Sequence, residues 1–355
     1  MTSLLSALPH PIVQAPMAGG GSTAAMAAEV SDAGGLGSIA AAYLSGAALR
    51  AEAEAVRART ARPFAINLFC DTRGAAPPDT LARAHARLAP YREELGLEQP
   101  AAPALPADDR DEQLAALFAV RPAVFSFTFG IPEPAVLARC RAERIATLGT
   151  ATTVAEAIAL ERAGVDMICA QGAEAGAHRG TFLGPVADAL IGTLALVPQI
   201  VDAVRVPVVA AGGIGDGRGV AAVLALGAAA AQIGTAYLLA DEASISAPWR
   251  AALTGDAVHR TAITTAFSGR AARGIRNRFL DELEGDASIA PFPYQNAMTR
   301  DIRAACAAAG RADFLSLWAG QAAALARPGS ARALTERIAA EARGALARAG
   351  AVMRV

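Results

Sequence analysis

The chain has 355 residues, of which 54% are hydrophobic, and a formal net charge of -1 at pH 7. This length and apolar content suit one large domain, or a barrel with a small extra domain. The balanced charge gives no sign of nucleic acid or an anionic membrane as a partner. Every basic residue other than histidine is arginine. No lysine is therefore present to act as Schiff base or general base.

The cysteines and the first residues predict a cytoplasmic protein without a metal site. The four cysteines are widely scattered and form neither a CxxC pair nor a ligand cluster. The first ten residues lack the basic region of a signal peptide. Residues 219–240 carry no charge and are long enough to span a membrane. They are mostly Ala and Gly with Gln232 among them, so a helix followed by a core strand explains them better.

Short apolar runs alternate with longer segments of helical period along most of the chain. Alternating strands and helices favour a parallel sheet covered by helices, and eight such units favour closure into a barrel. Continuous apolar strands fit burial on both faces. The sequence therefore predicts the α/β class and a (β/α)8, or TIM, barrel. The predicted strands are Ile12–Ala15, Leu36–Ile39, Phe64–Leu68, Val124–Thr128, Ile145–Leu148, Met167–Ala170, Val208–Ala211 and Ala230–Ile233.

Two regions break this alternation. Residues 70–112 are Pro-rich and charged, and are interpreted as a helical excursion before the fourth strand. Residues 241–300 follow the eighth strand, where the last barrel helix is due, and contain aromatic residues and arginine clusters. We therefore expect a barrel over residues 1–240, a small inserted capping domain over 241–295, and C-terminal helices over 296–355 that return to the barrel.

The catalytic face of such a barrel lies at the carboxyl ends of its strands. A Gly-rich turn containing Met17 follows the first strand, and its glycines would let backbone approach a ligand closely. A plain tight turn is the alternative. Asn67, near the end of the third strand, could pair with the amide-like edge of a heterocycle, or could instead cap its own loop.

The loop after the sixth strand carries the strongest catalytic candidate. Small residues crowd positions 171–180, and the long polar side chains among them are Gln171, Glu174, His178 and Arg179. His178 could abstract a proton near neutral pH, or could simply hold backbone. Gln171 could bond a cofactor ring or a substrate. Glu174 and Arg179 are expected to brace the loop.

The last two strands end in glycines that could bind a phosphate. Gly212 and Gly213 follow the seventh strand, and Gly234 and Thr235 follow the eighth. Bare backbone N–H groups near helix starts hold anions well, and the last two loops of a (β/α)8 barrel commonly do so. In the inserted region, Arg270 and Arg273 could touch phosphate or brace the two domains, and Tyr294 could line a substrate pocket.

These motifs together resemble the nitronate monooxygenase family, formerly called 2-nitropropane dioxygenase. The resemblance runs over nearly the whole chain. It rests on Gln14–Gly19, Asn67, Gln171 with residues 176–180, residues 211–214, residues 232–235 and the segment 268–270.

The resemblance implies non-covalent FMN and an active-site histidine, His178, which acts as base on a nitroalkane or binds a nitronate anion. The expected reaction uses O2 and gives a carbonyl compound and nitrite. Where relatives place a lysine near the flavin or substrate, this chain has arginine or nothing. The FMN contacts that it implies are Met17, Asn67, Gln171, Gly176, Gly213, Gln232, Ile233, Gly234 and Thr235.

Two other functions stay open on sequence grounds. Related flavin barrels reduce enoyl thioesters or quinones with NAD(P)H and share much of this motif set. A phosphate cradle alone would also fit a flavin-free isomerase or a binding barrel. The expected partners are a small-molecule nitronate and O2, with a homodimer compatible with the sequence.

Overall fold

The computed structural model describes residues 4–70, 76–105 and 109–353. Its main sheet has eight parallel strands in the order β1-β9-β8-β6-β5-β4-β3-β2, and a bridge between Val13 and Leu36 joins its two ends. The predicted (β/α)8 barrel is confirmed, with small differences at the strand ends. The strands are β1 (Ile12–Gln14), β2 (Gly37–Ala40), β3 (Phe64–Phe69), β4 (Val124–Thr128), β5 (Ala146–Ala151), β6 (Met167–Gln171), β8 (Val208–Ala211) and β9 (Ala230–Ile233).

The barrel interior has an apolar part at the amino ends of the strands and a more polar part at their carboxyl ends. Side chains two residues apart point to the same face of a strand, so every second residue enters the barrel. Near the amino ends of the strands these residues form a packed apolar cluster, into which Leu5 from η1 (Leu4–Ala7) also packs. Nearer the carboxyl ends the inward positions become polar or small, as at Asn67, Ser126 and Gln232. The amino end is therefore sealed, and the carboxyl end is left to bind a ligand.

The outer layer of helices buries the other face of the sheet. The segment 219–240, which resembled a membrane span, consists of the end of α8, then β9 and η3 (Thr235–Leu239). No helix in the described part of the chain is long and apolar enough to cross a membrane. The outer helices are α1 (Ala24–Asp32), α2 (Gly46–Arg57), α4 (Arg110–Val120), α5 (Pro134–Ala142), α6 (Val154–Arg162), α7 (Thr193–Ala203), α8 (Gly217–Ala225) and α13 (Ala331–Val352).

The C-terminal helix α13 completes this layer by packing against α8 and α1. Gly217 lies at the contact with α8, where a Cβ would come within 2.3 Å of the Ala342 nitrogen. The N-terminus of α13 is capped by Ser330, whose hydroxyl accepts a hydrogen bond from the Ala333 N–H. The chain thus returns to the barrel after the insertion that follows β9.

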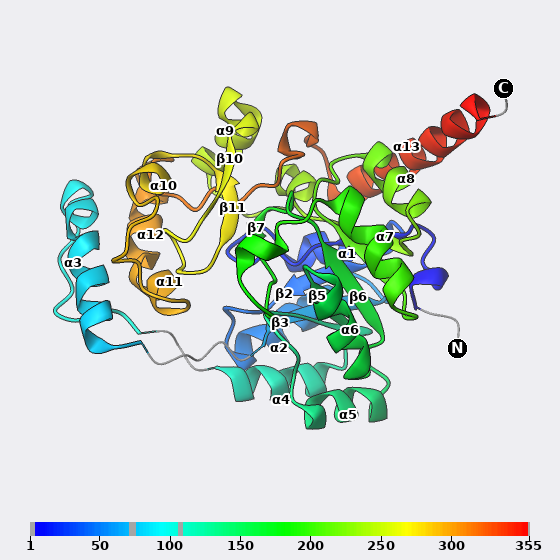
Figure 1. The fold of residues 1–355 in the computed structure, drawn as a ribbon, viewed down its shortest axis with the longest axis horizontal. Helices are drawn as coiled ribbons and strands as arrows, with labels where there is room; N and C mark the ends of the chain where they lie inside the picture. Colours follow the sequence, from blue (N-terminus) through cyan, green and yellow to red (C-terminus); the bar gives the residue numbers. More distant parts are fainter. Residues whose placement is uncertain (1–3, 71–75, 106–108, 354–355) are drawn as a thin grey trace.

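A second set of elements covers the carboxyl face, and we call α3 and the elements from α9 to α12 the cap (Figure 1). Its three-stranded sheet has the order β10-β11-β7, in which β7 comes from the loop after β6. The division into residues 1–240, 241–295 and 296–355 stays a prediction. The cap elements are α3 (Pro78–Glu94), α9 (Ala247–Thr254), η4 (Asp256–His259), β10 (Thr261–Thr264), β11 (Ala272–Ile275), α10 (Arg278–Glu282), α11 (Tyr294–Met298) and α12 (Arg300–Ala308), while β7 is Ala177–His178, η2 is Val186–Ala189 and η5 is Ala323–Leu325.

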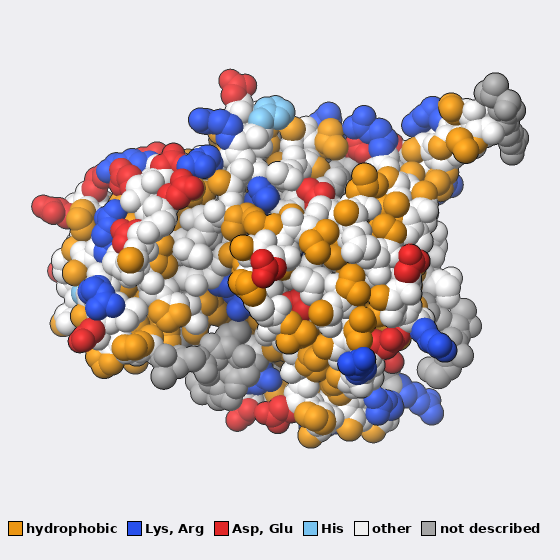
Figure 2. Space-filling model, viewed as in Figure 1, with side chains coloured by type: hydrophobic (Ala, Val, Ile, Leu, Met, Phe, Trp, Pro, Cys, Tyr) orange, Lys and Arg blue, Asp and Glu red, His pale blue; other side chains and the backbone are white. Residues whose placement is uncertain are grey.

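The helix α3 belongs to the excursion between β3 and β4, yet it packs against α11 of the cap. Arg92 fastens it there: its side chain is 2% exposed and donates to the Asp301 carboxylate and to the Met298 carbonyl, both at 2.7 Å. Basic and acidic side chains intermingle over the outer surface of the cap (Figure 2), in pairs such as Arg276 with Asp281. Exposed pairs of this kind contribute little, so Arg92 is the stronger link.

We expect Arg92→Ala to lower the free energy of unfolding by about 2 kcal/mol, because two charge-assisted hydrogen bonds are lost from a buried position. Urea denaturation followed by circular dichroism measures this change. Arg276→Ala, which removes an exposed pair, is the matched control and should cost less than about 1 kcal/mol. Equal losses in the two variants would contradict the assignment of Arg92 as the main polar link.

Candidate active site

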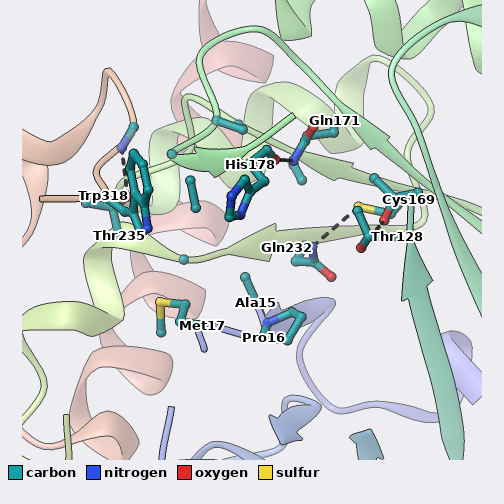
Figure 3. A pocket seen from close by; sticks show the side chains of 18 of the residues that line it. Ala15, Pro16, Met17, Thr128, Cys169, Gln171, His178, Gln232, Thr235 and Trp318 are labelled. Atoms are coloured by element: carbon teal, nitrogen blue, oxygen red, sulfur yellow. Dashed lines mark hydrogen bonds between the residues drawn. The ribbon is translucent and has the colours of Figure 1, made fainter. Parts of the chain in front are cut away.

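An open cavity lies at the carboxyl end of the barrel, between the polar inner layer and the cap (Figure 3). It encloses about 1380 Å³, including its open mouth. The inward residues of the strands form its floor, and the loops after them form its walls. From the floor come Asn67, Ser126, Leu148, Cys169, Ala211 and Gln232, and from the level above come Ala15, Phe69, Thr128, Thr150 and Gln171.

The strand β7 places His178 over this cavity. Two residues pair across to β11, His178 with Ala272 and Ala177 with Arg273, so the loop after β6 is fastened to the cap. Ala177 has a φ of 60°, an uncommon value for a residue with a side chain. Gln171 holds the same loop, because its amide donates to the His178 carbonyl at 3.0 Å and accepts from the Gly180 N–H at 2.8 Å.

The imidazole of His178 is surrounded by rings and by one hydroxyl. It stands inside the cavity between Trp318 and Gln171 (Figure 3). Its Nε2 lies 2.9 Å from the Ser268 hydroxyl. Burial, together with the positive charges of Arg270 and Arg303, lowers the pKa of His178 to about 3. Both causes disfavour the imidazolium, so the ring is neutral at physiological pH.

The Ser268 hydroxyl is coupled to the tautomer of the imidazole. A hydroxyl has one hydrogen, and the Ser268 Oγ also lies 3.1 Å from the Arg270 carbonyl, to which it can only donate. When the hydroxyl donates there, Nε2 of His178 is the donor to Ser268 and Nδ1 is the free acceptor; when the hydroxyl donates to Nε2 instead, Nδ1 carries the proton and is a free donor. Ser268 is therefore a positioning residue for the imidazole.

The glycines after β8 and β9 line the cavity, at the strand ends where the sequence predicts a phosphate cradle. Gly212 and Gly213 have φ values of 104° and 69°, a region that favours glycine. Among the described residues, the N–H groups of Gly213, Gly234 and Thr235 have no hydrogen-bond acceptor. All three residues line the cavity, and backbone N–H groups without an acceptor are suited to an anion. The Thr235 hydroxyl is occupied, since it accepts from the Gly320 N–H at 3.0 Å.

Most of the other residues proposed from the sequence also line the cavity. Met17, Asn67, Gly176 and Gln232 do so. Ile233 is fully buried and does not. The Asn67 amide donates to the Ser126 hydroxyl at 3.0 Å. The Gln232 amide points to the thiol of Cys169, whose pKa burial raises to about 12. That thiol is neutral and is not a nucleophile.

The charged residues near the loop act as braces. Arg179 is fully buried and donates to the backbone carbonyls of Gly172, Gln171 and Ala189. Glu174 accepts from the N–H and hydroxyl of Thr193. These contacts confirm the expected bracing roles.

The arginines of the inserted segment also hold backbone. Arg270 donates to the carbonyls of Arg179 and Thr181, and Arg273 donates to the Ala173 carbonyl at 3.0 Å. Of the two roles left open for this pair, bracing is therefore the one that the contacts support. Tyr294 is not among the described residues that line the cavity.

The aromatic surroundings of His178 were missed from the sequence. Ring centroids of Phe129, Phe292 and Trp318 each lie 5.7 Å from that of His178, and the Phe69 centroid lies at 6.3 Å. Phe69 and Phe129 directly follow two predicted strands, and this position at the carboxyl ends could have indicated that they line the cavity. Phe292 and Trp318 come from distant loops, and their contact with His178 depends on the cap.

The fold and the cavity together define a (β/α)8-barrel enzyme with its active site at the carboxyl face of the barrel. The model of the nitronate monooxygenase family matches residues 2–341. A Staphylococcus aureus (strain Newman) protein named "Probable nitronate monooxygenase" is 42% identical over 325 residues, which is 90% of each chain. This chain belongs to the nitronate monooxygenase family.

Solved structures agree with this assignment. Nitroalkane oxidase from Streptomyces ansochromogenes matches with a TM-score of 0.91 and 42% identity, covering 97% of this chain and 99% of that chain. FabK from Thermotoga maritima matches with a TM-score of 0.74 and 25% identity, covering 97% of this chain and 96% of that chain. The barrel and the cap elements are thus present together in these relatives.

We expect Ser268→Ala to lower kcat/KM roughly fivefold, the cost of one lost hydrogen bond to the imidazole. Steady-state oxidation of a nitronate measures it, with thermal unfolding recorded in parallel. Ser288→Ala is the matched control, because that hydroxyl bonds Asp286 at the outer side of the cap. An unchanged kcat/KM in Ser268→Ala would show that the hydroxyl does not position His178.

Proposed function

We propose that the chain oxidises alkyl nitronates with O2 and bound FMN, giving a carbonyl compound and nitrite. The observation that carries this proposal is the neutral imidazole of His178, held in a cavity whose lining also offers free backbone N–H donors. Family membership supports the reaction class. Cytoplasmic location and a homodimer stay predictions from the sequence.

The residues at the cavity fit FMN. The free N–H groups of Gly213, Gly234 and Thr235 suit a terminal phosphate. The polar side chains of Asn67 and Gln232 on the cavity floor offer donors and acceptors to a heterocycle. Bound there, FMN would supply the electron-accepting ring that passes electrons to O2.

The protein's own contribution is to bind and orient the substrate. In the tautomer whose Nε2 accepts from Ser268, the neutral imidazole of His178 has a free Nδ1–H that can donate to a nitronate oxygen without a charge of its own. Arg270 and Arg303 add positive potential at the ring, as their effect on its pKa shows. The rings around His178 keep bulk water away, which strengthens that potential.

The same features favour a nitronate over its neutral nitroalkane. Oxidation of a nitroalkane first requires removal of a carbon-bound proton, and a base works best when its pKa lies near the working pH. The lowered pKa of His178 makes it a weak proton acceptor. The nitronate has already lost that proton and needs no base.

The decisive experiment uses the purified holoenzyme. Its absorbance spectrum should show a bound flavin, and a freshly diluted nitronate should release nitrite under air without nicotinamide. A reductase of enoyl thioesters or quinones, the alternative left open by the sequence, would instead show rapid anaerobic bleaching of the flavin by NADH. A flavin-containing protein that releases no nitrite above background would reject the proposed activity.

The pH dependence follows from the lowered pKa of His178. With its pKa near 3 instead of the ordinary 6.5, the imidazole stays neutral from mildly acidic to alkaline pH. We therefore expect kcat/KM for a nitronate to show no ionisation of this histidine between pH 5 and pH 8. A pH profile with an inflection near 6.5, absent in His178→Asn, would contradict the neutral ring.

Gly234→Val tests the cradle. The glycine has a φ of -109°, which any residue adopts, and a Cβ there would lie 3.4 Å from the Cβ of Ala15. The fold should therefore survive while the extra methyl groups crowd the phosphate site. We expect the affinity for flavin to fall at least about tenfold. The flavin absorbance per chain that remains after dialysis measures this loss.

Gly350→Val is the control for Gly234→Val, because a Cβ at Gly350 meets nothing within 4 Å in α13. Full flavin occupancy in Gly234→Val would show that the phosphate does not bind beside Gly234.

A further inference from the structure

We propose that Glu156 is a positioning residue for the active site, which acts on His178 through the backbone of residues 179–183 and through Arg270. The inference rests on the proposed function, because it assigns a further residue to that reaction. Glu156 belongs to α6, is fully buried, and is not among the described residues that line the cavity. Any effect that it has on catalysis therefore passes through other residues.

The carboxylate of Glu156 joins the end of a barrel strand to the loop that follows His178. One oxygen accepts from the N–H and the hydroxyl of Thr152, directly after β5, at 2.6 and 2.7 Å. The other oxygen accepts from the N–H groups of Phe182 and Leu183, the latter at 2.9 Å. These donors fill the roughly four lone-pair positions of a carboxylate. The loop is thus anchored to the barrel by one buried, fully bonded group.

Helix capping does not account for this carboxylate. A threonine at the N-cap with a glutamate three residues later usually forms a capping box, in which the glutamate side chain returns to the N-cap N–H. Thr153 does cap α6, since its hydroxyl accepts from the Glu156 N–H at 3.2 Å. The side chain of Glu156, however, bonds Thr152 and the loop beyond β7. The glutamate therefore serves the loop of the histidine.

Arg270 binds the same loop from the side of the cap. Its guanidinium donates to the carbonyls of Arg179 and Thr181. The Thr181 hydroxyl donates to that of Thr152 at 2.9 Å, because the Thr152 hydrogen is already directed to Glu156. Burial lowers the pKa of Arg270 to about 10, and the negative charge of Glu156 counteracts this change. Glu156 therefore supports both the guanidinium and the carbonyl that it binds.

Two contacts carry the position of Arg270 to the imidazole. The Ser268 Oγ lies 3.1 Å from the Arg270 carbonyl and 2.9 Å from Nε2 of His178. The guanidinium also covers the ring of Phe129 at 3.8 Å from its centroid, and that centroid lies 5.7 Å from the imidazole. A displaced Arg270 would therefore change both the hydroxyl and a ring beside His178. None of these contacts involves the glycines of the proposed phosphate cradle.

The first test is Glu156→Gln in the holoenzyme. Glutamine keeps the shape but loses the charge and cannot accept from all four donors, so kcat/KM for a nitronate should fall about tenfold. Flavin absorbance per chain after dialysis should not change. Asp166→Asn is the matched control, because Asp166 accepts from the N–H and hydroxyl of Thr147 at the sealed end of the barrel. Equal losses of kcat/KM in the two variants, or a loss of flavin in Glu156→Gln, overturn the inference.

A double-mutant cycle separates positioning from general destabilisation. If Glu156 acts through Arg270 and Ser268, then Glu156→Gln combined with Ser268→Ala should lower kcat/KM about tenfold, little more than Glu156→Gln alone. Independent effects would multiply to about fiftyfold, from the tenfold and fivefold losses of the single variants. A multiplicative loss overturns the inference.

The last test observes the imidazole and does not depend on turnover. The 15N chemical shifts of labelled histidine report the ratio of the two tautomers, and His178→Asn identifies the His178 signals among those of the four histidines. Glu156→Gln should change this ratio at least twofold, and Asp166→Asn should leave it unchanged.

Thr181→Val is a milder second variant, because it removes one hydroxyl from the same loop, and it should change the tautomer ratio in the same direction. Unchanged His178 shifts in the folded variants overturn the inference. If no nitronate is oxidised by the unaltered holoenzyme, the proposed function fails, and these shifts still decide whether Glu156 positions the imidazole.

Discussion

The pairing of β7 with β11 is the contact on which the active site depends. It joins a two-residue strand from a barrel loop to the sheet of the cap, and one of those two residues is His178. The same contact brings the Ser268 hydroxyl to the imidazole, because Ser268 lies a few residues before β11. A barrel without its cap would keep the glycine cradle and lose the environment of the histidine. Under the proposed function, the barrel would bind the phosphate and its contact with the cap would position the substrate.

Much of the barrel could be predicted from local patterns. Parallel strands buried on both faces are short apolar runs, and eight such runs alternating with helical segments leave few other architectures. The Gly-rich strand ends were readable for a related reason, since a backbone that approaches an anion tolerates few side chains there. His178 was recognisable because it stands in a loop of small residues directly after a strand.

The rest depended on contacts between residues far apart in the chain. The sequence did not indicate that Ser268 bonds His178, that α3 docks on α11 and α12 through Arg92, or that Phe292 and Trp318 reach the imidazole. Gln171 shows a different limit. Its position at a strand end suggested a ligand contact, but both ends of its amide already hold the loop of His178. An amide at the right place can serve the scaffold, and the sequence alone does not separate the two roles.

The absence of lysine has a chemical consequence for an enzyme of this class. All the basic side chains coloured blue in Figure 2 are arginines, since the chain contains no lysine. Aldehydes and ketones condense readily with primary amines, and the arginine guanidinium is far less nucleophilic because it stays protonated. A chain that releases carbonyl compounds and has no ε-amino groups cannot form lysine Schiff bases with its own product.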